Sequence, residues 1–171
     1  MPNTSQYHKE LINELKRVME HEGLKKGFLE VGKILHEIKE NKTYKNIKPN
    51  DPHYTFEKYC MEAPDYLPGS SPAGRKSVIS KLILIYKFFL ANKNKLAKAE
   101  LIPLGYTKSY ELAKFYFRNP KESLRQPLKL GYQLKQNDFA KMLSAKGCKH
   151  EEVVTAKVCK KCKTIIKIMN Q

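Results

Sequence analysis

Acidic residues are scarce in the second part of this 171-residue chain, and that shortage is its most informative feature. Residues 1–65 hold 11 Lys and Arg against 11 Asp and Glu, so their charges cancel. Residues 66–171 hold 22 against 6, an excess that equals the net charge of the whole chain, +16. A neutral part followed by a strongly basic part predicts an anionic partner for the basic part, and nucleic acid is the commonest such partner.

Arginine is also rare, because 29 of the 33 basic residues are lysines and only Arg17, Arg75, Arg118 and Arg125 are arginines. A forked guanidinium reads guanine edges well, whereas the lysine ammonium is a hydrated point charge that suits phosphate. The composition therefore favours binding to the nucleic-acid backbone over extensive base readout. A lysine-rich surface that serves only solubility is the alternative interpretation.

The chain lacks a hydrophobic run long enough to cross a bilayer. Its longest apolar stretch, residues 78–90, is interrupted by Lys81 and Lys87 and is shorter than the roughly 20 residues that a membrane span needs. The first residues are polar and charged, unlike a secretory signal. Three of the four cysteines cluster with a histidine, a pattern that suits metal binding in a reducing compartment. We expect a soluble, intracellular, cytoplasmic protein without a membrane partner.

Apolar residues recur at helical spacing along most of the chain. Gly23 is a plausible stop for the first helix, and Gly32, inside the second, would let another helix approach closely. The segment 75–92 is apolar nearly all round, so we expect it to be the central helix. Loops are expected at 43–53 and 64–74, which are rich in turn residues. The predicted helices cover about residues 6–22, 25–41, 55–61, 75–92, 95–102, 107–118, 120–131 and 137–145.

Two of these helices carry start signals. Thr55 is a candidate cap of the short helix 55–61. Asn119, Pro120 and Glu122 fit the Ncap, N1 and N3 positions of a near capping box that opens the helix 120–131.

The predicted fold class is mainly α, a bundle of seven or eight helices with a small β-hairpin at the C-terminal end. Strand-like sequence appears only at 152–158 and 164–169, which are rich in Val, Ile and Thr. The chain therefore divides into neutral helices at 1–65, a basic helical region at 66–146 and a tail at 147–171.

The tail contains a Cys-x-His pair and, after eight residues, a Cys-x-x-Cys pair. Two such pairs can close a tetrahedron around one cation, and sulfur with imidazole suits zinc. All four positions are filled by protein, which favours a structural Zn²⁺ in a zinc-ribbon-like hairpin over a catalytic metal. A redox pair formed by the second motif is the alternative. The predicted metal ligands are Cys148, His150, Cys159 and Cys162, with Lys160 and Lys161 placed to meet phosphate.

Residues 104–114 read as a glycine turn that enters a helix, as in a helix-turn-helix unit whose supporting helix would be 95–102. Leu112, Ala113 and Phe117 would then face inward. Two ordinary helices joined by a glycine turn are the alternative. The side chains expected to be exposed to nucleic acid are Thr107, Lys108, Ser109 and Tyr110, with Lys114, Arg118, Lys121 and Arg125 continuing the basic edge.

Two further features of the basic region could meet nucleic acid. The loop before Arg75 and Lys76 is rich in Pro, Gly and Ser and could present backbone amides to a phosphate at a helix N-terminus. The aromatic residues between 106 and 117 alternate with lysines, so they could stack on unpaired bases, which keeps RNA and single strands open. Core packing is the alternative role for these rings.

One resemblance adds to this interpretation. Residues 32–44, residues 54–60 with the sequence Tyr-Thr-Phe-Glu-Lys-Tyr-Cys, and residues 105–113, which begin Gly-Tyr-Thr-Lys, together resemble a helical domain of phage, plasmid and other mobile-element proteins. The pattern there is Gly-x-x-Leu-x-x-Ile, a Tyr, Phe-x-x-Tyr-Cys and a later Gly-Tyr-Ser/Thr-Lys segment. The likeness covers residues 25–143 and implies association with DNA.

No spacing of Ser, His, Cys or carboxylate residues asks for catalysis, so we expect a protein that is not an enzyme. The first hypothesis is a DNA-binding accessory or regulatory protein of a mobile element, whose neutral part is free to bind a protein partner. An RNA-binding ribonucleoprotein component and a basic inhibitor or adaptor that docks on an acidic protein are the alternatives.

We predict that Cys159→Ser abolishes zinc binding and unfolds the tail while the helices stay folded, because the metal supplies the folding energy of so small a module. Bound zinc and the exchange of tail amides measure this. Cys60→Ser is the control, since we expect Cys60 to be a buried apolar residue and not a ligand. Retained zinc with unchanged tail exchange in Cys159→Ser would contradict the assignment.

Overall fold

The computed structural model describes residues 4–62, 66–146, 155–158 and 165–169. The helices of the first half are α1 (Thr4–His21), α2 (Gly23–Glu40), the 3-10 helix η1 (Thr43–Ile47), α3 (Phe56–Glu62) and α4 (Pro72–Asn92). The second half continues with α5 (Lys98–Leu101), the 3-10 helix η2 (Ile102–Leu104), α6 (Gly105–Arg118), α7 (Arg125–Gln133) and α8 (Gln136–Lys146). The prediction of a helical bundle is thus confirmed for the described residues up to 146, of which no helix is long and apolar enough to span a membrane.

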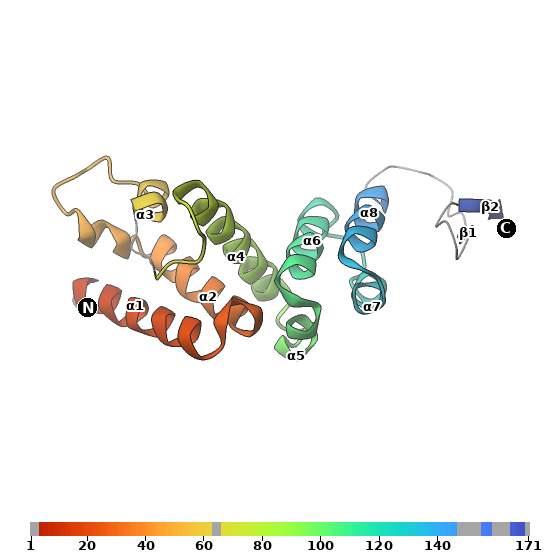
Figure 1. Ribbon diagram of the computed structural model, residues 1–171, viewed down its shortest axis with the longest axis horizontal. Helices are drawn as coiled ribbons and strands as arrows, with labels where there is room; N and C mark the ends of the chain where they lie inside the picture. Colours follow the sequence, from red (N-terminus) through yellow and green to blue (C-terminus); the bar gives the residue numbers. More distant parts are fainter. Residues whose placement is uncertain (1–3, 63–65, 147–154, 159–164, 170–171) are drawn as a thin grey trace.

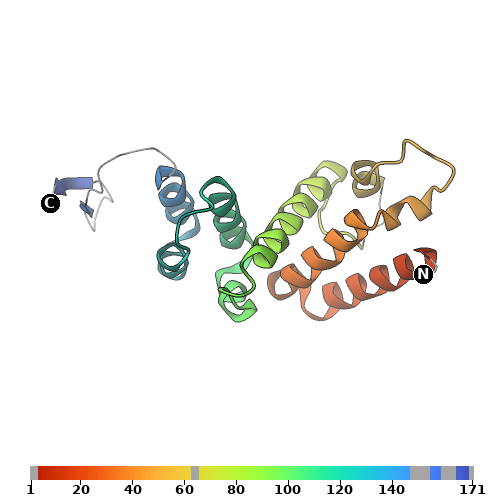
Figure 2. The same cartoon turned by 180° about the vertical axis from the view of Figure 1, so that it is seen from behind.

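Helix α4 occupies the centre of the bundle, as its apolar sequence predicts. It packs against α2 and α3 on one side and α6 on the other, and α6 continues the packing to α8 (Figures 1 and 2). Ile79, Leu82 and Phe88 of α4 are completely buried, as are Phe28 and Leu35 of α2. One continuous core therefore runs from α1 to α8.

Gly32 sets the distance between α2 and α4. A β-carbon at this position would lie 2.6 Å from the backbone oxygen of Leu82 and 3.2 Å from Cβ of Tyr86. The two backbones can approach so closely only because residue 32 has no side chain. The sequence-based expectation for Gly32 is confirmed.

Helix α4 begins three residues earlier than its apolar stripe indicates. The Ser71 hydroxyl accepts a hydrogen bond from the Gly74 amide at 3.1 Å, and Pro72 occupies the first helical position. Both are helix-start signals that the interpretation of 64–74 as a loop missed. Thr55 does cap α3, because its hydroxyl accepts from the Lys58 amide at 3.2 Å.

The capping box predicted at Asn119, Pro120 and Glu122 is wrong. Asn119 ends α6 instead, since its backbone and side-chain amides both donate to the Phe115 carbonyl, at 2.9 and 3.1 Å. Helix α7 starts at Arg125, which places Pro127 in the first turn, where no amide is needed. A start at 120 would have put Pro127 in a helix interior, where its ring meets the carbonyl four residues before it.

Strands β1 (Thr155–Val158) and β2 (Ile165–Met169) pair antiparallel, with Thr155 opposite Met169 and Lys157 opposite Lys167. The predicted zinc ligands Cys148, His150, Cys159 and Cys162 lie outside the described residues, as do Lys160 and Lys161.

Gly32→Ala should lower the free energy of unfolding by about 1–3 kcal/mol, because α2 and α4 must move apart to admit the methyl group. Urea unfolding followed by circular dichroism measures the change. Gly74→Ala, also in a helix, is the control, since its methyl would meet only the Ser71 hydroxyl. We expect a change below about 1 kcal/mol there. Equal losses in the two variants would contradict the close approach.

His8 joins α1 to η1 inside the core, a role that its sequence context does not reveal. Its side chain is 7% exposed, Nδ1 lies 3.0 Å from the hydroxyl oxygen of the fully buried Thr43, and the ring meets Tyr59 edge-on. Burial lowers the pKa of His8 below its usual value of 6.5, because the charged form would lose its hydration. Burial is also the largest influence on the pKa of His36 and lowers it.

These lowered pKa values predict that the protein loses stability as the pH falls. The unfolded chain binds protons at His8 and His36 near pH 6.5, whereas the folded protein resists them until the pH passes the lowered pKa. We expect the free energy of unfolding to decrease between about pH 7.5 and pH 5.5. The decrease should be smaller in His8→Asn, which keeps a polar atom near the Thr43 hydroxyl. An identical pH dependence in His8→Asn and the parent protein would contradict this account.

Candidate nucleic-acid interface

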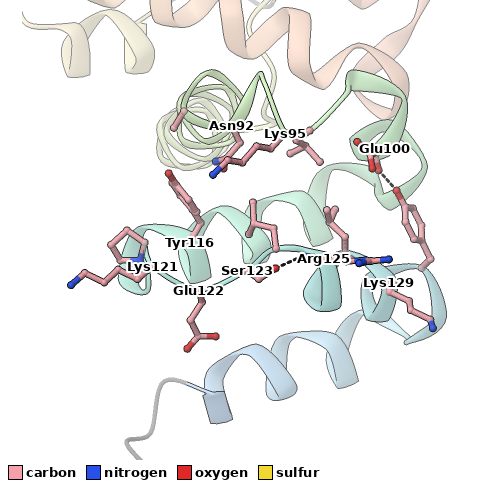
Figure 3. A pocket seen from close by; sticks show the side chains of 15 residues that line it. Asn92, Lys95, Glu100, Tyr116, Lys121, Glu122, Ser123, Arg125 and Lys129 are labelled. Carbon is pink, nitrogen blue, oxygen red and sulfur yellow. Dashed lines mark hydrogen bonds between the residues drawn. The ribbon is translucent and has the colours of Figure 1, made fainter.

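A groove of about 760 Å³ opens between the C-terminal end of α4 and helix α7 (Figure 3). One wall is formed by residues that follow or end α4, among them Asn92, Lys95 and Leu96, together with Glu100 of α5. The other wall is formed by residues 120–125 and by α7, and Tyr116 of α6 also lines the hollow. We call it the α4–α7 groove.

One face of α7 is turned to this groove. Arg125, Leu128, Lys129 and Tyr132 line it, and their spacing of three or four residues places them on the same side of a helix. Lys121 precedes Arg125 by four residues in the connection from α6. The basic side chains of α7 and Lys121 thus line one wall of the groove, and Lys95, which follows α4, lines the opposite wall.

Four cations surround the groove without an anionic partner. Lys95, Lys121, Arg125 and Lys129 are exposed, and no carboxylate of the described residues is within ion-pair distance of them. Two carboxylates also line the groove, so its cations outnumber its anions by four to two. The Glu100 carboxylate accepts the Ala97 amide at 2.7 Å, and the Glu122 side chain points away from Asn92 and Lys95 (Figure 3). The groove therefore carries a net positive charge.

Two tyrosine rings in the groove are held by the fold. The Tyr116 ring packs edge-on against Phe88 and Phe117, with centroid separations of 5.3 Å in both pairs, and it points toward Asn92 (Figure 3). The Tyr132 hydroxyl donates to the Glu100 backbone carbonyl, which ties α7 to α5. Tyr132 is nevertheless 48% exposed, so much of its ring remains accessible.

A second hollow, of about 480 Å³, lies between α3 and α4 and differs in its electrostatics. Lys76 forms an ion pair with Glu57, and Lys87 lies 3.3 Å from the Glu40 carboxylate. Cys60 lines this hollow as the buried residue that was expected, and burial raises the pKa of its thiol to about 12. Two of the three lysines that line this hollow are thus paired with carboxylates, and the third, Lys39, lies over the Phe56 ring.

The phosphate site expected at Arg75 and Lys76 stays a prediction, and two amides of this helix start have partners within the fold. The Arg75 amide donates to the Ser71 carbonyl at 2.7 Å, and the Gly74 amide donates to the Ser71 hydroxyl. Pro72 has no amide hydrogen to offer. The helix start is therefore occupied by its own cap.

The exposed recognition helix predicted at the start of α6 is also wrong. Ser109 is completely buried, with its hydroxyl 3.4 Å from the Leu101 carbonyl, and the Lys108 ammonium donates to the Gly131 carbonyl at 2.7 Å. Thr107 is exposed. The supporting helix, predicted at 95–102, is only the four-residue helix α5, Lys98–Leu101. The first turn of α6 is thus packed against its neighbours.

The inward face of α6 is also shifted from the prediction. Leu112 and Ala113 are buried as expected, but Phe117 is 46% exposed and Phe115 fills the core in its place. Gly105, with φ of +74°, provides the expected turn before the helix.

Some of the other predicted residues of α6 contact neighbouring side chains, and others are exposed. The Tyr110 ring lies between Lys81 and Lys114, whose ammonium nitrogens are 5.4 and 5.2 Å from its centroid. Lys114 is also 3.0 Å from the Glu111 carboxylate, whereas Arg118 is exposed. Burial raises the pKa of Tyr106 to about 12, so that ring belongs to the packing.

Lys121 and Arg125 are the two predicted residues that the structure brings together in the groove. Lys95, Lys129 and Tyr132 were missed. The four-residue spacing of 121, 125 and 129 was a sequence signal for one basic face, but the wrong helix start at 120 obscured it. For Lys95 the sequence offered no comparable signal, because its place depends on how the chain turns after α4.

Among the described residues, no group of three or more His, Cys, Asp or Glu side chains is arranged to hold a metal ion. No protein-family model matches this chain, no curated protein sequence matches it, and no solved structure matches its fold.

Proposed function

We propose that this protein binds nucleic acid, with DNA as the favoured polymer, through the basic surface centred on the α4–α7 groove. The observation that carries the proposal is the set of four cations around one hollow, Lys95, Lys121, Arg125 and Lys129, none of which forms an ion pair among the described residues. Like charges gathered without counter-charges repel one another, and a polyanion relieves that repulsion.

The chemistry of the groove favours the phosphate backbone. Three of its four cations are lysines, which bind phosphate as point charges and carry little base selectivity. The role we propose is that of an accessory or regulatory DNA-binding protein of a phage, plasmid or other mobile element, as the resemblance of residues 25–143 implies. No catalytic step is part of the proposal.

The neutral half and the tail complete the proposal. Residues 1–65, whose charges cancel, are the part that we propose for a protein partner. The structural Zn²⁺ stays a prediction from the sequence, and its binding by the tail is tested independently of the groove.

Steep salt dependence is the expected signature of this function. Contacts from four cations to phosphates give a slope of log K against log salt of about −3.6 with duplex DNA and about −2.8 with single strands. Replacing Lys121, Arg125 and Lys129 together by Gln should make the duplex slope shallower by about 2 to 3 and lower the affinity at least tenfold. Fluorescence anisotropy with labelled oligonucleotides, from 50 to 300 mM salt, measures both quantities.

Lys9, Lys25 and Lys26 changed together to Gln form the matched control, because these lysines are exposed in the neutral half and also lack ion pairs among the described residues. Affinity should change less than threefold there. Equal losses in the two triple variants would contradict the groove as the interface. Absence of binding to duplex DNA, single-stranded DNA and RNA at 100 mM salt would contradict the function and favour an acidic protein surface as the partner.

A further inference from the structure

We infer that the α4–α7 groove holds an unpaired nucleotide, so that the protein prefers single-stranded nucleic acid to duplex. The inference rests on the proposed function and adds the strand state of the ligand. It follows from the concave shape of the groove, its fixed tyrosine rings and the placement of its cations on both walls.

Shape separates the two strand states. A duplex offers a convex phosphate surface and keeps its bases stacked inside, whereas an unpaired strand can turn a base out into a hollow. The groove, at about 760 Å³, lies within the range of about 300–1,000 Å³ in which pockets enclose small ligands. It is therefore large enough for a nucleotide.

The element that would have entered a duplex groove is not available. Ser109 in the first turn of α6 is fully buried, and the Lys108 ammonium is engaged by the Gly131 carbonyl. Major-groove recognition needs a helix whose N-terminal side chains reach base edges. Of the predicted recognition residues, Thr107 is exposed, whereas Ser109 is buried and Lys108 is engaged within the fold.

The tyrosine rings supply stacking surfaces whose side-chain conformations are already restricted before binding. Phe88 and Phe117 fix the Tyr116 ring, and the hydrogen bond to Glu100 fixes Tyr132. Stacking on rings that are already held avoids much of the entropy loss that binding imposes on mobile side chains. Base stacking on aromatic side chains is also indifferent to base identity, which agrees with the scarcity of arginine.

Cations on both walls allow a strand to pass through the groove. Lys95 follows α4 on one wall, while Lys121, Arg125 and Lys129 lie on the opposite wall (Figure 3). Phosphates on either side of an inserted base can thus each meet an ammonium or guanidinium group. This combination of a charged track and aromatic surfaces is typical of proteins that bind single strands.

The test compares four ligands of equal length, labelled dT15, rU15, a mixed-sequence 15-nucleotide DNA strand and its 15-base-pair duplex, on the full zinc-loaded chain. The mixed strand should bind more tightly than the duplex at 150 mM salt. Tyr132→Ala and Tyr116→Leu should each weaken single-strand binding by about fivefold to about 150-fold, the range found when a base-stacking aromatic is removed. Their effect on duplex binding should stay below threefold. The ratio of dT15 to rU15 affinity identifies the sugar.

Two controls separate stacking from folding. Tyr132→Phe keeps the ring but loses the hydrogen bond to Glu100, so it should retain most of the single-strand affinity. Tyr86→Leu removes a half-buried ring of α4 that packs against His36 and does not line the groove, and it should leave binding within threefold. Circular dichroism spectra matching the parent protein establish that each variant is folded.

Equal affinity for the mixed strand and its duplex, unchanged in Tyr132→Ala and Tyr116→Leu but reduced in the triple Gln variant, would overturn this inference and leave the proposed function standing. If the parent protein bound none of the four ligands, the proposed function itself would be overturned. Weaker single-strand binding in Tyr132→Ala with retained binding in Tyr132→Phe would support the stacking role.

Discussion

The close approach of α2 and α4 at Gly32 is the contact on which the rest of the bundle depends. With only 2.6 Å between the position of an absent β-carbon and the Leu82 carbonyl, the two backbones fix the central layer of the core. Helix α4 carries this constraint along its length, because its other side packs on α6. The C-terminal end of α4, where Asn92 and Lys95 begin the groove, is therefore positioned by a contact near the middle of the same helix.

The groove combines two features that stability alone does not explain. Among the described residues, none of its four cations has an ion-pair partner, unlike Lys76 and Lys87 of α4, which each meet a carboxylate. Its tyrosines are held by neighbours and yet keep accessible surface, as the 48% exposure of Tyr132 shows. Unpaired charge and accessible rings are the two features on which the proposed nucleic-acid binding rests.

Composition and periodicity predicted much of this protein, but the groove depends on details they do not reveal. The apolar stripes located the helices, and Gly32 predicted that another helix approaches α2 closely, while the structure identifies that helix as α4. Helix boundaries were mispredicted where local signals compete. Asn119 has the side chain of an N-cap, but it ends α6. Pro127 is tolerated only in a first turn, which fits the start of α7 at Arg125. Ser109 shows the other limit, because a polar residue in a basic segment is buried by a tertiary contact to Leu101.

The most direct measurement of the central claim is hydrogen–deuterium exchange of the full chain with and without a saturating 15-nucleotide single strand at low salt. The account predicts slower exchange in peptides that cover residues 91–100 and 120–133, with little change in residues 4–40. Slower exchange confined to residues 4–62, or no change in 120–133 under conditions where the strand is bound, would contradict it.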